Sequence, residues 1–193
     1  MVLWAGLWIY GIGEALVIDA RLGNAPWTVL AEGLSKRTGL TIGEMTILIG
    51  AVVLCLWWPL GERPGFGTVC NIILIGISID VMDRVVPHPD ALAARGLQAV
   101  AGIIVGGLGI ALYLSAHLGP GPRDGVMTAL HARTGHPITW VRLALESGAL
   151  VGGIALGGRF GAATVLFALT IGHVFGVWLA VLDHLDRRSV VLA

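Results

Sequence analysis

Six continuous apolar runs divide the chain, and they constrain its fold more than any other feature. A helix of about 20 residues crosses the roughly 30 Å hydrocarbon core of a bilayer, and each run has about that length. Of the residues, 56% are hydrophobic and only 12% are charged. Barrel strands would alternate in polarity over about ten residues, which these runs do not. The predicted fold class is all-α, a polytopic membrane protein with spans at about residues 3–20, 42–60, 66–84, 97–117, 138–156 and 162–182.

The second half of the chain repeats the first at a constant offset of 96 residues. The stretch LGNAPWTVLAEGLSKRTG at 22–39 shares its LG, P, L and RTG positions with LGPGPRDGVMTALHARTG at 118–135. The match continues without a gap into the later loops, which shared hydrophobicity alone would not align. We therefore predict two three-span repeats, residues 1–84 and 97–184, joined by a linker at residues 85–96.

Each predicted repeat contains three spans, an odd number, so the second repeat enters the membrane from the opposite side. The prediction is thus two inverted three-helix repeats. Many secondary transporters have this architecture and move their halves about a site near the bilayer midplane. An inert duplicated scaffold is the other interpretation, and the architecture favours transport over it.

A polar stretch follows the first span of each repeat and predicts a short helix there. Pro26 and Pro122 stand where proline suits the first helical turn. Each helix could lie on the membrane surface or dip between the spans as a half-helix, and both placements stay open. A half-helix start would join Arg123 to free backbone amides as a cradle for a carboxylate or phosphate, with Asp124 offsetting part of the charge. Arg123 could equally face headgroup phosphates. Trp27 completes this set of candidates.

Ionisable side chains inside the predicted spans are further candidates. Glu14, Glu146 and His173 fall near span centres, where a lone charge costs at least about 2.5 kcal/mol, so each should face the interior and have a partner. Arg142 precedes Glu146 by four residues, within pairing reach. We predict Arg142 as an anion contact and Glu146, Glu14 and His173 as candidates for proton coupling. The structural alternatives are a self-neutralising Arg142–Glu146 pair and a satisfied core histidine. Asn71 would bridge helices or line a cavity.

Several functional classes lack their motifs in this sequence. It has no Walker loop, no dinucleotide glycine fingerprint after a strand, no His/Cys metal cluster and no serine-centred elbow. We therefore expect no enzymatic activity, no cofactor and no metal site. The formal net charge is zero and no basic run exists, which argues against nucleic acid as a partner. The expected partners are a small-molecule substrate and the lipid bilayer, and a homo-oligomer stays open.

Six motifs read together resemble one known family: LGNAPWTVL, RTGLTIG, GFGTVCN, LGPGPRDGVMT, VRLALESG and GAATVLFALTIG. They are similar to the YczE/YitT-type bacterial integral membrane proteins, in particular the YczE-like branch. The resemblance implies a multi-pass protein of the bacterial cytoplasmic membrane. Positions 122–124, Arg142 and Glu146 match the family pattern. His173 stands where the family often has proline, which argues against a shared role for a histidine.

The combined expectation is a six-span secondary transporter for small organic molecules that are anionic or amphipathic. Export is one of the directions of transport that we consider. Alternating access would move the substrate, with proton coupling through a carboxyl group. The alternative from another class is a non-transporting accessory factor that stabilises or assists a biosynthetic or membrane enzyme complex.

Overall fold

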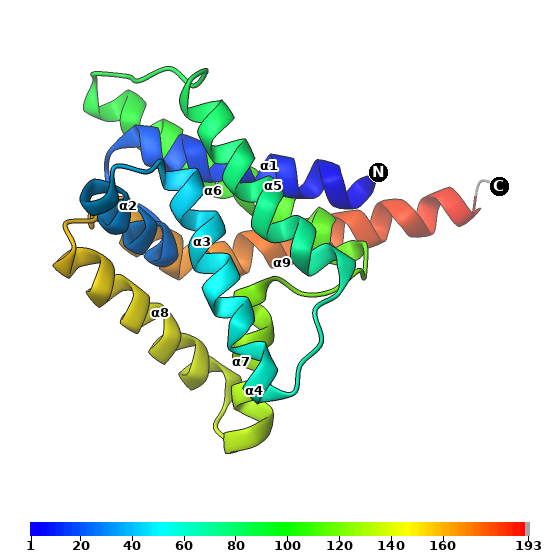
Figure 1. The fold of residues 1–193 in the computed structure, drawn as a ribbon. Coiled ribbons are helices and arrows are strands. Elements are labelled where there is room, and N and C mark those ends of the chain that lie inside the picture. Colours follow the sequence, from blue (N-terminus) through cyan, green and yellow to red (C-terminus); the bar gives the residue numbers. More distant parts are fainter. Residues whose placement is uncertain (192–193) are drawn as a thin grey trace.

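The computed structural model describes residues 1–191 and the side chains of residues 1–185, and this part of the chain contains helices but no strands (Figure 1). Six segments are long and apolar enough to cross a membrane, in agreement with the predicted spans. The helices in chain order are α1 (Val2–Ala20), α2 (Pro26–Thr38), α3 (Ile42–Cys55), α4 (Trp57–Leu60), α5 (Phe66–Asp83), α6 (Leu92–Ser115), α7 (Pro122–Thr134), α8 (Ile138–Ala155) and α9 (Ala162–Val191).

Proline explains two differences between the predicted and observed boundaries. The second span is broken at Leu56 into α3 and α4, because Pro59 has no N–H and its ring crowds the carbonyl of Cys55 four residues earlier. The predicted linker was too long, since α6 begins at Leu92 rather than at residue 97. Hydropathy placed the charged Arg95 outside the span. Most residues after Pro89 are good helix formers, so the helix can begin as soon as the prolines of the linker end.

The 96-residue repeat of the sequence is also a repeat of the backbone. The two short helices that follow the first span of each half, α2 and α7, start and end at equivalent residues. Residues with positive φ recur at the same offset, since Arg21 and His117 have φ of 54° and 52° and Gly23 and Gly119 have φ of 109° and 116°. Each half therefore consists of three spans and one short helix.

The two halves meet along α1 and α6, which are equivalent helices packed antiparallel through glycines. A Cβ added at Gly6 would lie 3.0 Å from the carbonyl oxygen of Gly109, and one added at Gly102 would lie 2.7 Å from that of Gly13. Gly6 and Gly102 are equivalent positions, and so are Gly13 and Gly109. Reciprocal contacts of this kind arise when a two-fold axis relates two copies, so they indicate a local two-fold relation between α1 and α6.

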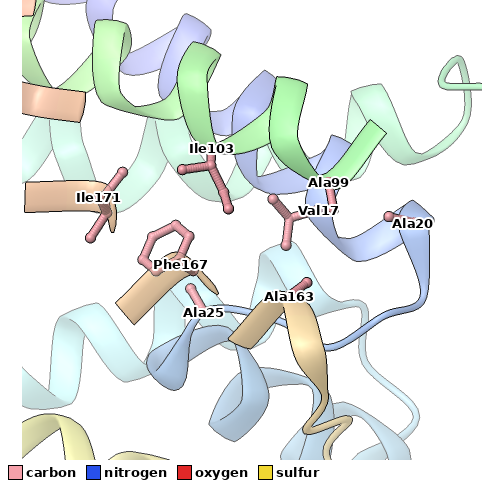
Figure 2. Packing of buried hydrophobic residues seen from close by; sticks show 8 residues of the cluster. All are labelled: Val17, Ala20, Ala25, Ala99, Ile103, Ala163, Phe167 and Ile171. Carbon is pink, nitrogen blue, oxygen red and sulfur yellow. The ribbon is translucent and has the colours of Figure 1, made fainter. Parts of the chain in front are cut away.

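The loop after the first span of each half docks on the last helix of the other half. The amide of Ala163 donates to the carbonyl of Leu22 over 2.9 Å, and the equivalent amide of Gly67 donates to Leu118 over 2.8 Å. The core behind the first of these contacts joins α1, α6, α9 and the start of α2 (Figure 2). Its buried residues are Val17, Ala20, Ala25, Ala99, Ile103, Ala163, Phe167 and Ile171. The halves are thus interlocked rather than simply adjacent.

We predict that Gly13→Ala destabilises the protein, because its methyl group would overlap the backbone of Gly106 and Gly102. Overpacking of this kind costs about 1–3 kcal/mol. Gly148→Ala is the matched control, since a Cβ at Gly148 meets nothing within 4 Å and alanine is the better helix former. Thermal unfolding in detergent should give a lower midpoint for the first variant only; equal midpoints would contradict the close α1–α6 packing.

Candidate functional site

A cavity of about 390 Å³ lies between the two halves and is lined by residues from both. Many of the lining residues occupy equivalent positions in the repeats, so both halves contribute similar parts of the wall. The walls are mainly aliphatic and aromatic, and the polar side chains come from a few positions. The equivalent pairs that line it include Pro26 and Pro122, Trp27 and Arg123, Thr28 and Asp124, Thr46 and Arg142, Gly50 and Glu146, and Ile75 and Ile171.

Both short helices begin at this cavity and not on the surface of the bundle. Pro26 and Pro122 are buried at the first positions of α2 and α7 and line the cavity. The residues before them, Ala25 and Gly121, have no side chain that could accept a hydrogen bond, and neither helix start has a side-chain cap. The first amides of a helix have no partner within the helix. Two uncapped helix starts therefore present backbone N–H groups beside the cavity.

Arg123 stacks on Trp27, its equivalent in the other repeat, with the guanidinium carbon 4.9 Å from the centre of the indole ring. This cation–π contact explains how a cation is tolerated at a helix start, where the dipole disfavours it. No hydrogen bond of the Arg123 guanidinium is present within the part of the chain that the structure describes. Its N–H groups are therefore available to a ligand.

Glu14, which the sequence placed at the centre of the first span, is 3% exposed and lines the cavity. Its Oε2 accepts a hydrogen bond from the hydroxyl of Thr28 over 2.6 Å. Its Oε1 is buried and accepts no hydrogen bond from the residues that the structure describes. A buried carboxyl oxygen without a donor is unfavourable, and a proton or a donor group on a ligand would satisfy it.

Asp124 lies next to Arg123 and accepts a hydrogen bond from the hydroxyl of Tyr113 over 3.2 Å. Burial raises the pKa of the Asp124 carboxyl, because desolvation penalises its charged form, while the Tyr113 hydroxyl and the charge of Arg123 oppose this effect. Asp124 on α7 therefore takes up a proton more readily than an ordinary aspartate.

Arg142 and Glu146 form the predicted i,i+4 pair on α8, with Nε and Oε1 2.8 Å apart. Both line the cavity, but their side chains are 47% and 28% exposed, far more than Glu14. Asn71 on α5 also lines the cavity. All three residues thus line the cavity, with Arg142 and Glu146 at its open edge.

His173, which we expected to face the interior, has its side chain exposed on α9 and does not line the cavity. A central position in a span does not determine which face a residue occupies, and α9 packs with only part of its circumference. Trp57, in contrast, is more buried than its position at the end of a span suggests. A tryptophan at a span end is usually an interfacial belt residue, but Trp57 is 2% exposed and donates its indole N–H to the carbonyl of Pro122 over 2.9 Å.

Glu32 organises a polar cluster that the sequence analysis did not single out. Its Oε2 accepts hydrogen bonds from the side chain of Asn24 over 2.8 Å and the amide of Arg159 over 2.7 Å. Its Oε1 lies 2.8 Å from the amine of Lys36, which also donates to the carbonyl of Gly157. The cluster fastens α2 to the α8–α9 loop. The i,i+4 spacing of Glu32 and Lys36 was the signal available in the sequence.

The chain is similar to proteins of the family described as "Family of unknown function (DUF6198)", whose model matches residues 1–180. An "Uncharacterized protein" of Haemophilus influenzae is 40% identical over 186 residues, 96% of this chain and 85% of that protein. The "Uncharacterized membrane protein YczE" of Bacillus subtilis is 34% identical over 174 residues, 89% of this chain and 80% of that protein. No solved structure matches the chain. The resemblance to YczE is confirmed, and the chain is a membrane protein.

Proposed function

Because the chain belongs to the DUF6198 family, a family of unknown function, we propose its function from the cavity itself. The proposal is a secondary transporter of the bacterial cytoplasmic membrane that carries small organic molecules with an anionic group, among them amphipathic ones. The observation that carries it is the cavity between the halves, lined by both repeats and by both short-helix starts. Secondary transporters built from two repeats bind their substrates at such places.

Inversion of the repeats is part of this proposal. α1 and α6 are equivalent, antiparallel and each long enough to span a bilayer, and an axis that relates two antiparallel spans is perpendicular to both. Such an axis would lie in the plane of the membrane, with the halves in opposite orientations. The number of spans in each repeat, which is odd, independently supports the same arrangement.

An anionic substrate group is proposed because the donors in the cavity suit one. Arg123 has no hydrogen-bonding partner in the described residues, and the uncapped starts of α2 and α7 add amides and the positive ends of two helix dipoles. Arg142 at the open edge could leave its ion pair with Glu146 and bind the anionic group of the substrate instead. Glu14 and Asp124 offer sites for a proton, so coupling to a proton gradient would neutralise the cavity as substrate enters. The aromatic and aliphatic walls suit an apolar remainder.

The two halves differ in a way that supports alternating access. In the first half α3 packs closely on α5, and a Cβ at Gly76 would lie 2.5 Å from Ile47. In the second half α8 and α9 barely contact each other, and a Cβ at Gly172, the equivalent of Gly76, meets nothing within 4 Å. Since similar halves can adopt each other's conformation, we propose a second state in which α8 packs on α9 and α3 leaves α5.

We predict that cysteines at positions 143 and 172, the equivalents of Ile47 and Gly76, form a disulfide in membranes, although α8 and α9 are apart here. The double variant Leu143→Cys/Gly172→Cys would be made in a background in which Cys55 and Cys70 are replaced, and oxidised mildly. Ile47→Cys/Gly76→Cys is the control pair, which the present packing already brings together. A cross-link in the control pair alone would contradict the second state.

The proposed function is tested directly by thermal-shift screening of the purified chain against small carboxylates, phosphates and single-chain anionic amphiphiles. We expect members of one chemical class to raise the unfolding temperature and to move across liposomes that contain the protein. If no compound stabilises it and none is transported, while one defined protein co-purifies with it, the chain is an accessory factor instead.

A further inference from the structure

Three metal-ligating side chains meet outside the cavity, where the ends of α1 and α5 approach the segment that joins the halves. Asp19 lies in the last turn of α1, Asp83 is the last residue of α5, and His88 follows in the connecting segment. Each offers one ligand atom, and these atoms all lie within 4.8 Å of one another. The sequence predicted no metal site, because these residues are separated along the chain and form no spacing motif.

Asp19 carries the observation that points to a ligand. It is 3% exposed, and its Oδ1 lies 3.1 Å from Nε2 of His88. Its Oδ2 is buried and has no hydrogen-bond partner. A buried carboxylate oxygen loses its hydration and requires compensation from a donor or a cation. Protein groups within the described residues provide such compensation for one oxygen of Asp19 but not for the other.

The local field favours a cation at this place. The C-terminal end of a helix carries partial negative charge, so carboxylates at the ends of α1 and α5 are unfavourably placed unless a cation is near. Arg95 of α6 donates to the carbonyls of Ala20 and Arg21 over 2.8 and 2.7 Å, which satisfies the end of α1. Among the described residues, Arg95 forms no hydrogen bond or ion pair with Asp19 or Asp83. The charged groups near Asp19 are therefore Asp83, His88 and Arg21, and among the described residues only His88 lies within ion-pair distance of it.

The cluster is also a departure from the repeat and not a product of it. The equivalent positions in the second half are Ser115, Leu179 and His184, which could not form the same ligand set. The duplicated fold thus does not require two acids and a histidine to meet here. The arrangement is specific to the first half and to the segment that leads into the second.

We propose that Asp19, Asp83 and His88 bind a divalent first-row transition metal ion, such as Mn²⁺ or Zn²⁺. Carboxylates suit Mn²⁺ and imidazole suits Zn²⁺ and Fe²⁺, whereas an imidazole ligand disfavours Mg²⁺ and Ca²⁺. The ion takes one oxygen from each carboxylate and the His88 nitrogen, and water fills its other positions. It ties the connecting segment to the ends of α1 and α5 in the first half.

The test is a titration of the purified full chain, stripped with a chelator, with Mn²⁺ followed by electron paramagnetic resonance. We expect one saturable site from which Zn²⁺, but not Mg²⁺, displaces Mn²⁺. Asp83→Asn and His88→Ala change exposed residues, so the variants should fold, and each should weaken Mn²⁺ binding by roughly ten-fold or more. Asp90→Asn, an exposed acid in the same segment, is the matched control and should bind as the wild type does.

Absence of saturable Mn²⁺ and Zn²⁺ binding would overturn the proposal, and so would binding that survives both Asp83→Asn and His88→Ala. In that case Asp19 and His88 form an ion pair only. The titration needs no transported substrate and the site lies outside the cavity. Its failure would therefore leave the transport proposal intact, and failure of transport would leave the metal site intact.

Discussion

Arg123→Ala should reduce substrate affinity and transport by roughly 10- to 100-fold. A hydrogen bond to a charged group contributes about 1.5–3 kcal/mol, and Arg123 is the arginine on the first turn of α7. Arg142 compensates only in part, because it is on α8 and must leave Glu146, 2.8 Å away, before it can bind the substrate. The measurement is uptake into liposomes of a compound identified by thermal shift, together with the concentration dependence of that shift.

Two further variants separate a binding role of Arg123 from a structural one. Arg123→Lys keeps the charge but loses the planar group that stacks on Trp27, so we expect partial activity. Arg63→Ala removes an exposed loop arginine that does not line the cavity and should leave transport unchanged. If Arg123→Ala transports normally while remaining folded, Arg123 faces headgroup phosphates and another group binds the anion.

The spans and the short helices could be predicted because their signals are local or depend on a constant offset. Continuous apolar length identifies a span, and Pro26 and Pro122 with the later RTG motifs mark the ends of the short helices. The i,i+4 pair of Arg142 and Glu146 is likewise local, and the structure contains it. Glu14 followed from the cost of a charge at the centre of a span, which leaves the interior as its only stable location.

The features that could not be predicted depend on which helices pack against each other. His173 is as central in its span as Glu14, but α9 leaves that face unpacked, and hydropathy carries no information about faces. Asp19, Asp83 and His88 meet only because α1 and α5 end at the same place. The asymmetry between α3–α5 and α8–α9 is also invisible in the aligned repeats, although Glu146 occupies the position of Gly50 and adds bulk to α8.

Glu32→Ala should be the most destabilising single substitution among those considered. It leaves the side-chain amide of the fully buried Asn24 and the backbone amide of Arg159 without an acceptor. A buried unsatisfied donor costs about 1–3 kcal/mol, so we expect a loss of roughly 2–4 kcal/mol. The ion pairs add little, because Lys36 and Arg159 are 46% and 39% exposed. Thermal unfolding in detergent should show a midpoint lower by roughly 5–15 °C.

Two controls make the reason for that loss testable. Glu32→Gln keeps an acceptor oxygen and the size of the side chain, so it should lose much less stability than Glu32→Ala. Thr128→Ala changes the equivalent position of the second repeat, which is exposed and bonds only within α7, and should unfold near the wild-type midpoint. Equal losses of stability in Glu32→Gln and Glu32→Ala would instead show that the negative charge of Glu32 stabilises the fold.

The same cluster bears on transport, because it holds the α8–α9 loop about which α8 would move toward α9. The equivalent positions of Asn24, Glu32 and Lys36 are Pro120, Thr128 and Ala132, so the other half has no matching anchor. A loop that is fastened in one half only gives α8 a fixed end and a free end. We therefore expect Glu32→Ala to lower the yield of the 143–172 cross-link more than Thr128→Ala does, since α8 would no longer approach α9 along a defined path. An unchanged yield would mean that the cluster stabilises the fold without guiding the motion.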